Sequence, residues 1–109
     1  MKVCDIADKL SLKPLSLTDS SREVTGAYIG DLLSWVMGRA DSGDAWITIM
    51  SNINIVAVAS LADVACIILA EGVVPDENVC TTALQKGINI YTSDKTAYVL
   101  ATELAQCLQ

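Results

Sequence analysis

The stretch from Ala45 to Ala62 carries no charged side chain, and this constrains the fold more than any other feature of the sequence. Its length reaches the threshold for a membrane-spanning helix. Polar residues nevertheless interrupt it, and the apolar run that follows is opened by Asp63 and closed by Glu71. An ionisable group and clustered amides are costly in hydrocarbon, so we expect a buried core element and no membrane span. The interrupting residues are Thr48, Ser51, Asn52, Asn54 and Ser60.

From Ala45 onward, the hydrophobic pattern predicts strands and helices in strict alternation. The first strand is apolar on both faces, as expected for a strand buried between two layers. Alternation of this kind is typical of right-handed βαβ units. We therefore predict an α/β fold, with a mainly parallel β-sheet and helices on both faces. The predicted strands are 45–50, 65–70 and 88–93, and the predicted helices are 54–62, 76–86 and 94–108.

Residues typical of helix ends support these boundaries. Asn52 and Asn54 are suitable N-caps for the helix 54–62, and Ser93 or Asp94 is suitable for the last helix. Lys86-Gly87 is a typical helix stop.

The N-terminal part is less regular. Residues 3–9 have helical spacing, and 11–26 indicate a short strand that runs into an exposed turn. A further helix follows Gly30, with Asp31 as its N-cap. At 109 residues the chain is long enough for one core, so we expect a single domain, 1–109.

Three segments also resemble a known family: Gly30-Asp31-Leu32-Leu33-Ser34, "AWITIMSNINIVAVASLADVACIILAEG" and "GINIYTSDKTAYVLATEL". Together they resemble the DRTGG domain family over nearly the whole chain. Such domains occur alone, beside CBS domains and inside enzymes such as phosphotransacetylases. They are similar in fold to the N-terminal domains of HPr kinase/phosphorylase and of the MurF ligases. The resemblance implies a regulatory or ligand-binding domain without chemistry of its own.

The five-residue motif that names the family is absent. The positions that align with it read Asn52-Ile53-Asn54 and Ala70-Glu71-Gly72.

In open parallel sheets, ligands bind beyond the carboxyl ends of the strands, where loops meet helix N-termini. This rule selects the loops "MSNIN", "AEGVVPDE" and "TSDKT". Free amide N–H groups there are suited to an anion. The alternative is that each polar residue only caps a helix. The candidate ligand-binding residues are Ser51, Asn52, Asn54, Glu71, Gly72, Ser93, Lys95 and Thr96.

Several classes of function are disfavoured. The chain has no histidine from which to build a nucleophile–base pair, and nothing brings Asp31 and Glu71 together as a carboxylate pair. The net charge is −6 and the seven Lys and Arg residues are scattered, which argues against nucleic acid. We expect no enzymatic activity, no cofactor and no metal site.

The cysteines and the N-terminus bear on location. No two cysteines form a CxxC pair, so we expect reduced thiols. The first ten residues are charged and lack the apolar region of a signal peptide, so we expect a cytoplasmic protein. The cysteines are Cys4, Cys66, Cys80 and Cys107.

Self-association is expected from composition, because 52% of the residues are hydrophobic and only 18% are charged. The aromatic residues do not alternate with basic ones, which favours a place in the core or an interface. We therefore predict a non-catalytic regulatory domain that senses a small anionic or nucleotide-like metabolite as a homodimer. The alternative is a protein–protein adaptor without a small ligand, acting on a kinase or redox enzyme.

Overall fold

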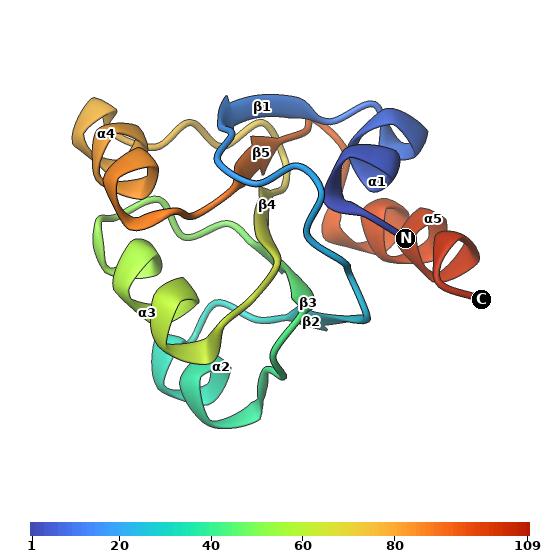
Figure 1. Cartoon of the computed structure of the whole chain (residues 1–109), viewed down its shortest axis with the longest axis horizontal. Coiled ribbons are helices and arrows are strands. Elements are labelled where there is room, and N and C mark those ends of the chain that lie inside the picture. The colour runs from blue at the N-terminus through green and yellow to red at the C-terminus, as the bar shows by residue number, and fades with distance from the viewer.

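The computed structural model describes residues 1–109 as a five-stranded sheet flanked by helices (Figure 1). The strand order is β1-β5-β4-β3-β2; β1 is antiparallel to β5, and all other pairs are parallel. The predicted α/β fold with a mainly parallel sheet is confirmed. The elements are α1 (Val3–Leu10), β1 (Lys13–Ser16), β2 (Gly26–Ile29), α2 (Leu33–Arg39), β3 (Asp44–Thr48), α3 (Asn54–Ala62), β4 (Cys66–Leu69), α4 (Glu77–Lys86), β5 (Ile90–Thr92) and α5 (Ala97–Cys107).

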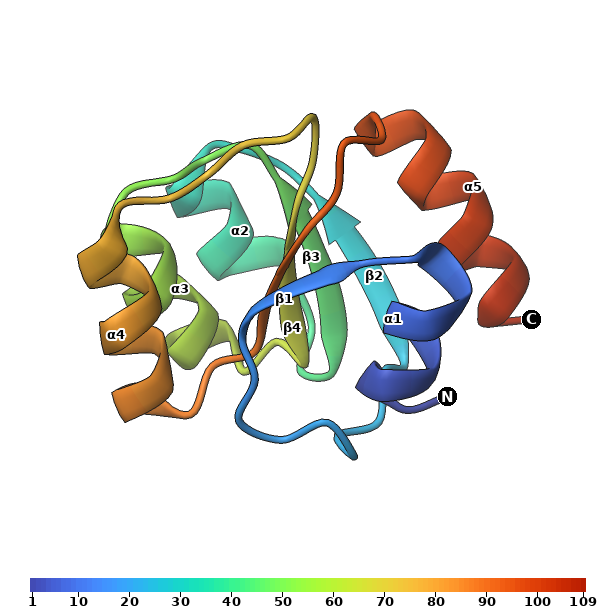
Figure 2. The same cartoon turned by 90° about the horizontal axis from the view of Figure 1, so that it is seen from above.

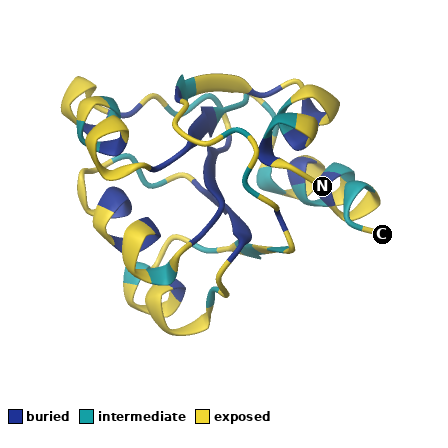
Figure 3. Ribbon diagram, in the orientation of Figure 1, coloured by how far each residue is buried: buried dark blue, intermediate teal, exposed yellow.

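The sheet separates two layers of helices (Figure 2). Alternate side chains of β3 enter different cores, because Ala45 and Ile47 pack with α1 and α5 while Trp46 packs with α2, α3 and α4. Every residue of β3 and β4 is buried, as Figure 3 shows for the centre of the sheet. The prediction of strands covered on both faces is therefore confirmed.

The boundaries of the central helices also agree with the sequence pattern. Helix α3 spans the predicted residues Asn54–Ala62, and α4 ends at Gly87, whose φ of 75° is left-handed. The Gly87 N–H donates to the carbonyls of Ala83 and Leu84. Glycine adopts this conformation without the steric cost of a Cβ, which explains the stop.

Three predicted caps are wrong. The N-cap position of α2 is Leu32, while Asp31 Oδ1 accepts from Thr48 Oγ1 (2.8 Å) and the Ile49 N–H (3.0 Å). The cap of α5 is Thr96, whose Oγ1 accepts from the Val99 N–H.

In α3 the N-cap position is Ile53, without a side-chain cap bond. Asn52 Oδ1 instead accepts from the Asn54 N–H, forming a local turn before the helix.

Strand β2 was not predicted. It is short and lies between Gly26 and Gly30, so the sequence around it resembles a loop. Its pairing with β3 supplies the order that its own residues do not indicate.

The segment between β1 and β2 is fastened to the sheet by Asn89, which is 3% exposed. Asn89 Oδ1 accepts from the Thr18 N–H, the Thr18 hydroxyl and the Asp19 N–H. Its Nδ2 donates to the carbonyls of Asp19 and Ala65. One side chain thus provides hydrogen-bond partners for a loop that has no secondary structure of its own.

None of the helices is both long enough and apolar enough to cross a membrane.

Candidate functional site

The loops that follow the parallel strands meet at the carboxyl ends of these strands, at the top of Figure 2. Backbone hydrogen bonds connect neighbouring loops. The Ala70 N–H donates to the Thr48 carbonyl (3.0 Å), the Glu71 N–H to the Lys95 carbonyl (2.8 Å) and the Gly72 N–H to the Ser93 carbonyl (2.8 Å). The structure therefore brings Glu71, Gly72, Ser93 and Lys95 together.

Most of the polar groups in the loop before α5 already form hydrogen bonds or ion pairs within the chain. Ser93 Oγ accepts from the Lys95 N–H (3.1 Å), and Thr96 caps α5. The Lys95 ammonium lies 2.8 Å from Glu103 Oε1 and donates to the Leu10 carbonyl. The charge of Lys95 is therefore already balanced, and its side chain ties α5 to the end of α1.

The loop before α3 has free backbone donors, as the starts of α4 and α5 also do. The backbone N–H groups of Ser51, Asn52 and Ile53 donate no hydrogen bond within the chain. They precede α3, where the helix dipole favours negative charge. Three of the predicted residues, Ser51, Asn52 and Asn54, thus lie where an anion has donors available.

A groove of about 440 Å³ lies between α3 and α4; Ile53 and Asn54 line it, whereas Ser51 and Asn52 do not. That volume is within the range of about 300–1,000 Å³ that is typical of small-ligand sites. Asn54 lies at the start of α3 and Lys86 at the end of α4. The lining residues are Ile53, Asn54, Val56, Ala57, Ser60, Leu61, Thr82 and Lys86.

Lys86 is exposed and forms no salt bridge. Arg22 is nearby, since a polar hollow of about 150 Å³ that shares Ser60 and Lys86 with the groove is also lined by Arg22 and Asp63. Arg22 Nη1 lies 3.0 Å from Asp63 Oδ1. Hydrogen bonds from Arg22 and from Ser42 lower the pKa of the Asp63 carboxyl below its ordinary value. Lys86 is therefore the cation of this region that has no carboxylate partner.

Sequence reasoning missed Thr82 and Lys86. The rule that it applied selects loops at strand ends, whereas these side chains lie in the second half of a helix. Their spacing of four residues places them on one face of α4, but the sequence does not reveal that this face lies opposite α3.

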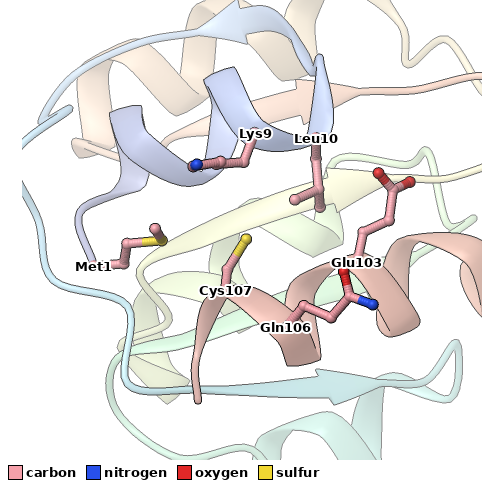
Figure 4. A pocket seen from close by; sticks show the side chains of 6 residues that line it. All are labelled: Met1, Lys9, Leu10, Glu103, Gln106 and Cys107. Carbon is pink, nitrogen blue, oxygen red and sulfur yellow. The ribbon is translucent and has the colours of Figure 1, made fainter.

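A separate hollow of about 270 Å³ lies between α1 and α5, on the other side of the sheet (Figure 4). It is lined by Met1, Lys9, Leu10, Glu103, Gln106 and Cys107. Its carboxylate, Glu103, is the one that pairs with Lys95. None of the predicted ligand-binding residues lines it.

Groups with shifted pKa values lie outside the groove. Burial raises the pKa of the Cys66 thiol to about 12, and burial is also the main cause of the raised pKa of Tyr91. Both side chains belong to the core between the sheet, α1 and α5. These shifts therefore reflect packing and not a reactive centre in the groove.

No protein-family model matches the sequence, and a search of curated proteins finds no similar one. One solved structure is similar over 96% of this chain, with a TM-score of 0.78 and 16% sequence identity. It contains the CBS and DRTGG domains of the regulatory region of Clostridium perfringens pyrophosphatase, complexed with its activator, diadenosine tetraphosphate. This chain spans 46% of that chain. The protein therefore shares its α/β fold with part of this CBS and DRTGG region.

Proposed function

We propose that residues 1–109 form one DRTGG-like regulatory domain, cytoplasmic and non-catalytic, that binds a small anionic or nucleotide-like metabolite and acts as a homodimer. The groove between α3 and α4 carries this proposal. Ile53 lines it at one end, next to Ser51 and Asn52, and these three residues have unpartnered backbone N–H groups. At the other end it is lined by Lys86, whose ammonium forms no salt bridge.

The lining of the groove suits a ligand that is part apolar and part anionic. Ile53, Ala57 and Leu61 offer exposed apolar surface along α3. A planar base or a similar ring system packs against such a surface, while Lys86 or the N–H groups before α3 take up the negative charge. Ser51, Asn52 and Asn54 are the contacts that we assign at the α3 end.

The remaining predicted residues have a structural role in the proposal. Their loops lie at the same carboxyl ends of the strands and are bonded to one another; the residues are Glu71, Gly72, Ser93, Lys95 and Thr96. We propose that they stabilise the conformation of these loops, and that the exposed Glu71 contacts a ligand that extends along them.

The structural neighbour guides the choice of ligand. Its regulatory region is complexed with diadenosine tetraphosphate, and it contains CBS domains in addition to a DRTGG domain. Adenine nucleotides, this dinucleotide included, are therefore the first compounds to test.

The test is a thermal-shift titration of the purified protein with diadenosine tetraphosphate, AMP, ATP and a panel of phosphorylated metabolites, followed by calorimetry. A bound ligand raises the melting temperature by mass action. We expect Lys86→Ala and Asn54→Ala each to weaken binding about tenfold, the loss expected for one hydrogen bond to a charged group.

Lys9→Ala is the matched control, because Lys9 is also an exposed lysine but lines the hollow on the other side of the sheet. A panel without any thermal shift would refute the ligand. Equal losses in Lys9→Ala and Lys86→Ala would refute the groove as its site.

The exposed apolar side chains favour one alternative, a protein–protein adaptor that acts on a kinase or redox enzyme. Leu32 and Trp35 are both more than half exposed. An adaptor would retain binding to its partner in Lys86→Ala and lose it in Trp35→Ala, whereas a metabolite sensor would show the reverse pattern with its ligand.

A further inference from the structure

The two edges of the sheet differ in how they resist pairing with another strand. β1 carries Lys13 and Pro14, and its register with β5 shifts between Pro14 and Ser16. A charge, a proline and an irregular register all block strand addition. β2, with the sequence GAYI, has none of these features and pairs with β3 in unbroken register. Its outer edge is therefore open to a further strand.

The backbone of β2 presents hydrogen-bonding groups at this edge. The Gly30 N–H donates to the Ile47 carbonyl of β3 (3.2 Å). Because successive residues of a strand direct their backbone groups to opposite sides, those of Ala27 and Ile29 point away from β3. Both residues are exposed.

Exposed apolar side chains lie on β2 and on the segment that follows it, which includes α2. Ile29 is 51% exposed, Leu32 56%, Trp35 51% and Met37 50%. Met37 is two residues from Trp35 on α2 and so points to another side of the helix. Without it, half-exposed side chains of this size contribute on the order of 300 Å² together, less than half of the roughly 800 Å² that each partner buries in a standard interface. The backbone of β2 and the neighbouring loops supply further area.

The charge of this region suits contact with an identical surface. In a twofold contact a side chain near the axis lies close to its own copy, so a charge there meets a like charge. Residues 26–39 contain only Asp31 and Arg39 as charged groups, although the chain carries a net charge of −6. The Asp31 carboxylate is bonded to Thr48 and Ile49, and the Arg39 guanidinium stacks on the Trp35 ring at 3.7 Å.

We propose that a second copy of this chain adds to β2 in antiparallel orientation, with Tyr28 on the twofold axis. This inference rests on the proposed function, whose homodimer it locates. In this register Ala27 of one copy lies opposite Ile29 of the other, and the two residues exchange N–H···O bonds through their free backbone groups.

The side chains agree with this register. Ala27 and Ile29 pair with Ala45 and Ile47 of β3, so both lie on the α1/α5 face of the sheet, where a small side chain meets a large one across the axis. Tyr28 lies on the other face with Trp46, and its ring covers Gly30, where a Cβ would be 2.8 Å from the ring.

Sedimentation velocity of the full chain, with circular dichroism to confirm folding, tests the proposal. We expect a dimer for the wild type and a monomer for Ile29→Lys and for Ala27→Glu. Leu84→Lys, at a residue that is 54% exposed on α4, is the matched control and stays dimeric.

The register has its own test. Mixing Ile29→Lys with Ala27→Glu places the new lysine opposite the new glutamate, so the mixture is expected to form a heterodimer that neither variant forms alone. A wild type that is monomeric at 100 µM (about a hundredfold above a Kd of 1 µM) would overturn the proposal, and so would a dimer that survives both substitutions.

A wild-type monomer whose β2 edge is covered by a different protein would also overturn it, and would favour the adaptor. The ligand titration separates the two proposals, because Ile29→Lys leaves the groove between α3 and α4 intact. If Ile29→Lys loses the dimer but binds the ligand as the wild type does, both proposals are supported. If the wild type is a dimer and binds no ligand, the interface is supported and the proposed metabolite sensor is refuted.

Discussion

At the scale of single residues, Asn89 has the largest structural consequence for its size. It makes five hydrogen bonds from a nearly buried position and is the contact between the loop at Thr18–Asp19 and the core. Removing such a side chain leaves buried donors and acceptors without partners, and each costs roughly 1–3 kcal/mol. We expect Asn89→Ala to lower the free energy of unfolding by about 3 kcal/mol in urea titrations.

Asn78→Ala provides the comparison for Asn89→Ala. Asn78 is exposed on α4, and its side chain makes no hydrogen bond within the chain. Equal urea midpoints for the two variants would contradict the role assigned to Asn89.

Asp63 makes the stability dependent on pH. Its pKa is lowered below the ordinary value of an aspartate in the folded protein, so its contribution is fully present above that ordinary value and is lost as the pH falls through the folded value. The residue is left-handed, with φ 57°, a conformation that asparagine adopts easily. We expect Asp63→Asn to cost about 1 kcal/mol or less at pH 7, because the pair with Arg22 is exposed, and less at pH 2.5 than at pH 7.

Urea midpoints at the two pH values measure this effect. Asp41→Asn is the control, since Asp41 is exposed and its carboxylate makes no hydrogen bond. The assignment fails if the difference between wild type and Asp63→Asn is as large at pH 2.5 as at pH 7.

At the scale of the elements, the start of α5 shows which polar residue acts as the cap. Thr96 Oγ1 accepts from the Val99 N–H at 3.2 Å, whereas Ser93 bonds to the Lys95 N–H and the Asp94 side chain has no partner. An N-cap is worth about 1 kcal/mol. We therefore expect Thr96→Ala to destabilise the protein by about 1 kcal/mol in thermal or urea unfolding, and Asp94→Ala to have little effect. A larger loss in Asp94→Ala would restore the cap that the sequence favoured.

The sequence predicts the elements best where the chain alternates regularly. From β3 to β5 the apolar runs are long enough, and the end of α4 is marked clearly enough by Gly87, for the order and type of each element to follow from pattern alone. β2 escapes this reasoning because its four residues acquire strand structure from β3 and not from their own preferences. The caps fail because Asp31, Ser93 and Asp94 are all suitable N-cap types, and tertiary contacts decide which one is used.

Part of the candidate site could likewise be predicted from the sequence, and part of it could not. The rule for parallel sheets selects Ser51, Asn52 and Asn54, and the structure leaves free N–H groups beside them. Lys95 satisfies the same rule, but its ammonium turns back to Glu103 and Leu10. Lys86 could not be found from sequence, because its place in the groove depends on how α3 packs against α4.

At the scale of the whole molecule, β4 lies in the middle of the sheet and its Cys66 reports on how the sheet opens. β4 is bonded to β3 on one side and β5 on the other, and Cys66 is 1% exposed. Burial also raises the pKa of its thiol to about 12, so the reactive thiolate is suppressed at pH 8. The thiol becomes reactive only when the sheet separates from α1 and α5, which is close to global unfolding.

A variant with Cys4, Cys80 and Cys107 replaced by serine isolates this thiol. We expect its reaction with Ellman's reagent at pH 8 to be slow in buffer and to accelerate with urea along the global unfolding curve. A second variant that retains only Cys107, which is half-buried near the end of α5, should react without denaturant. If Cys66 reacts as fast as Cys107 in buffer, then β4 opens locally and the two cores do not unfold as one cooperative unit.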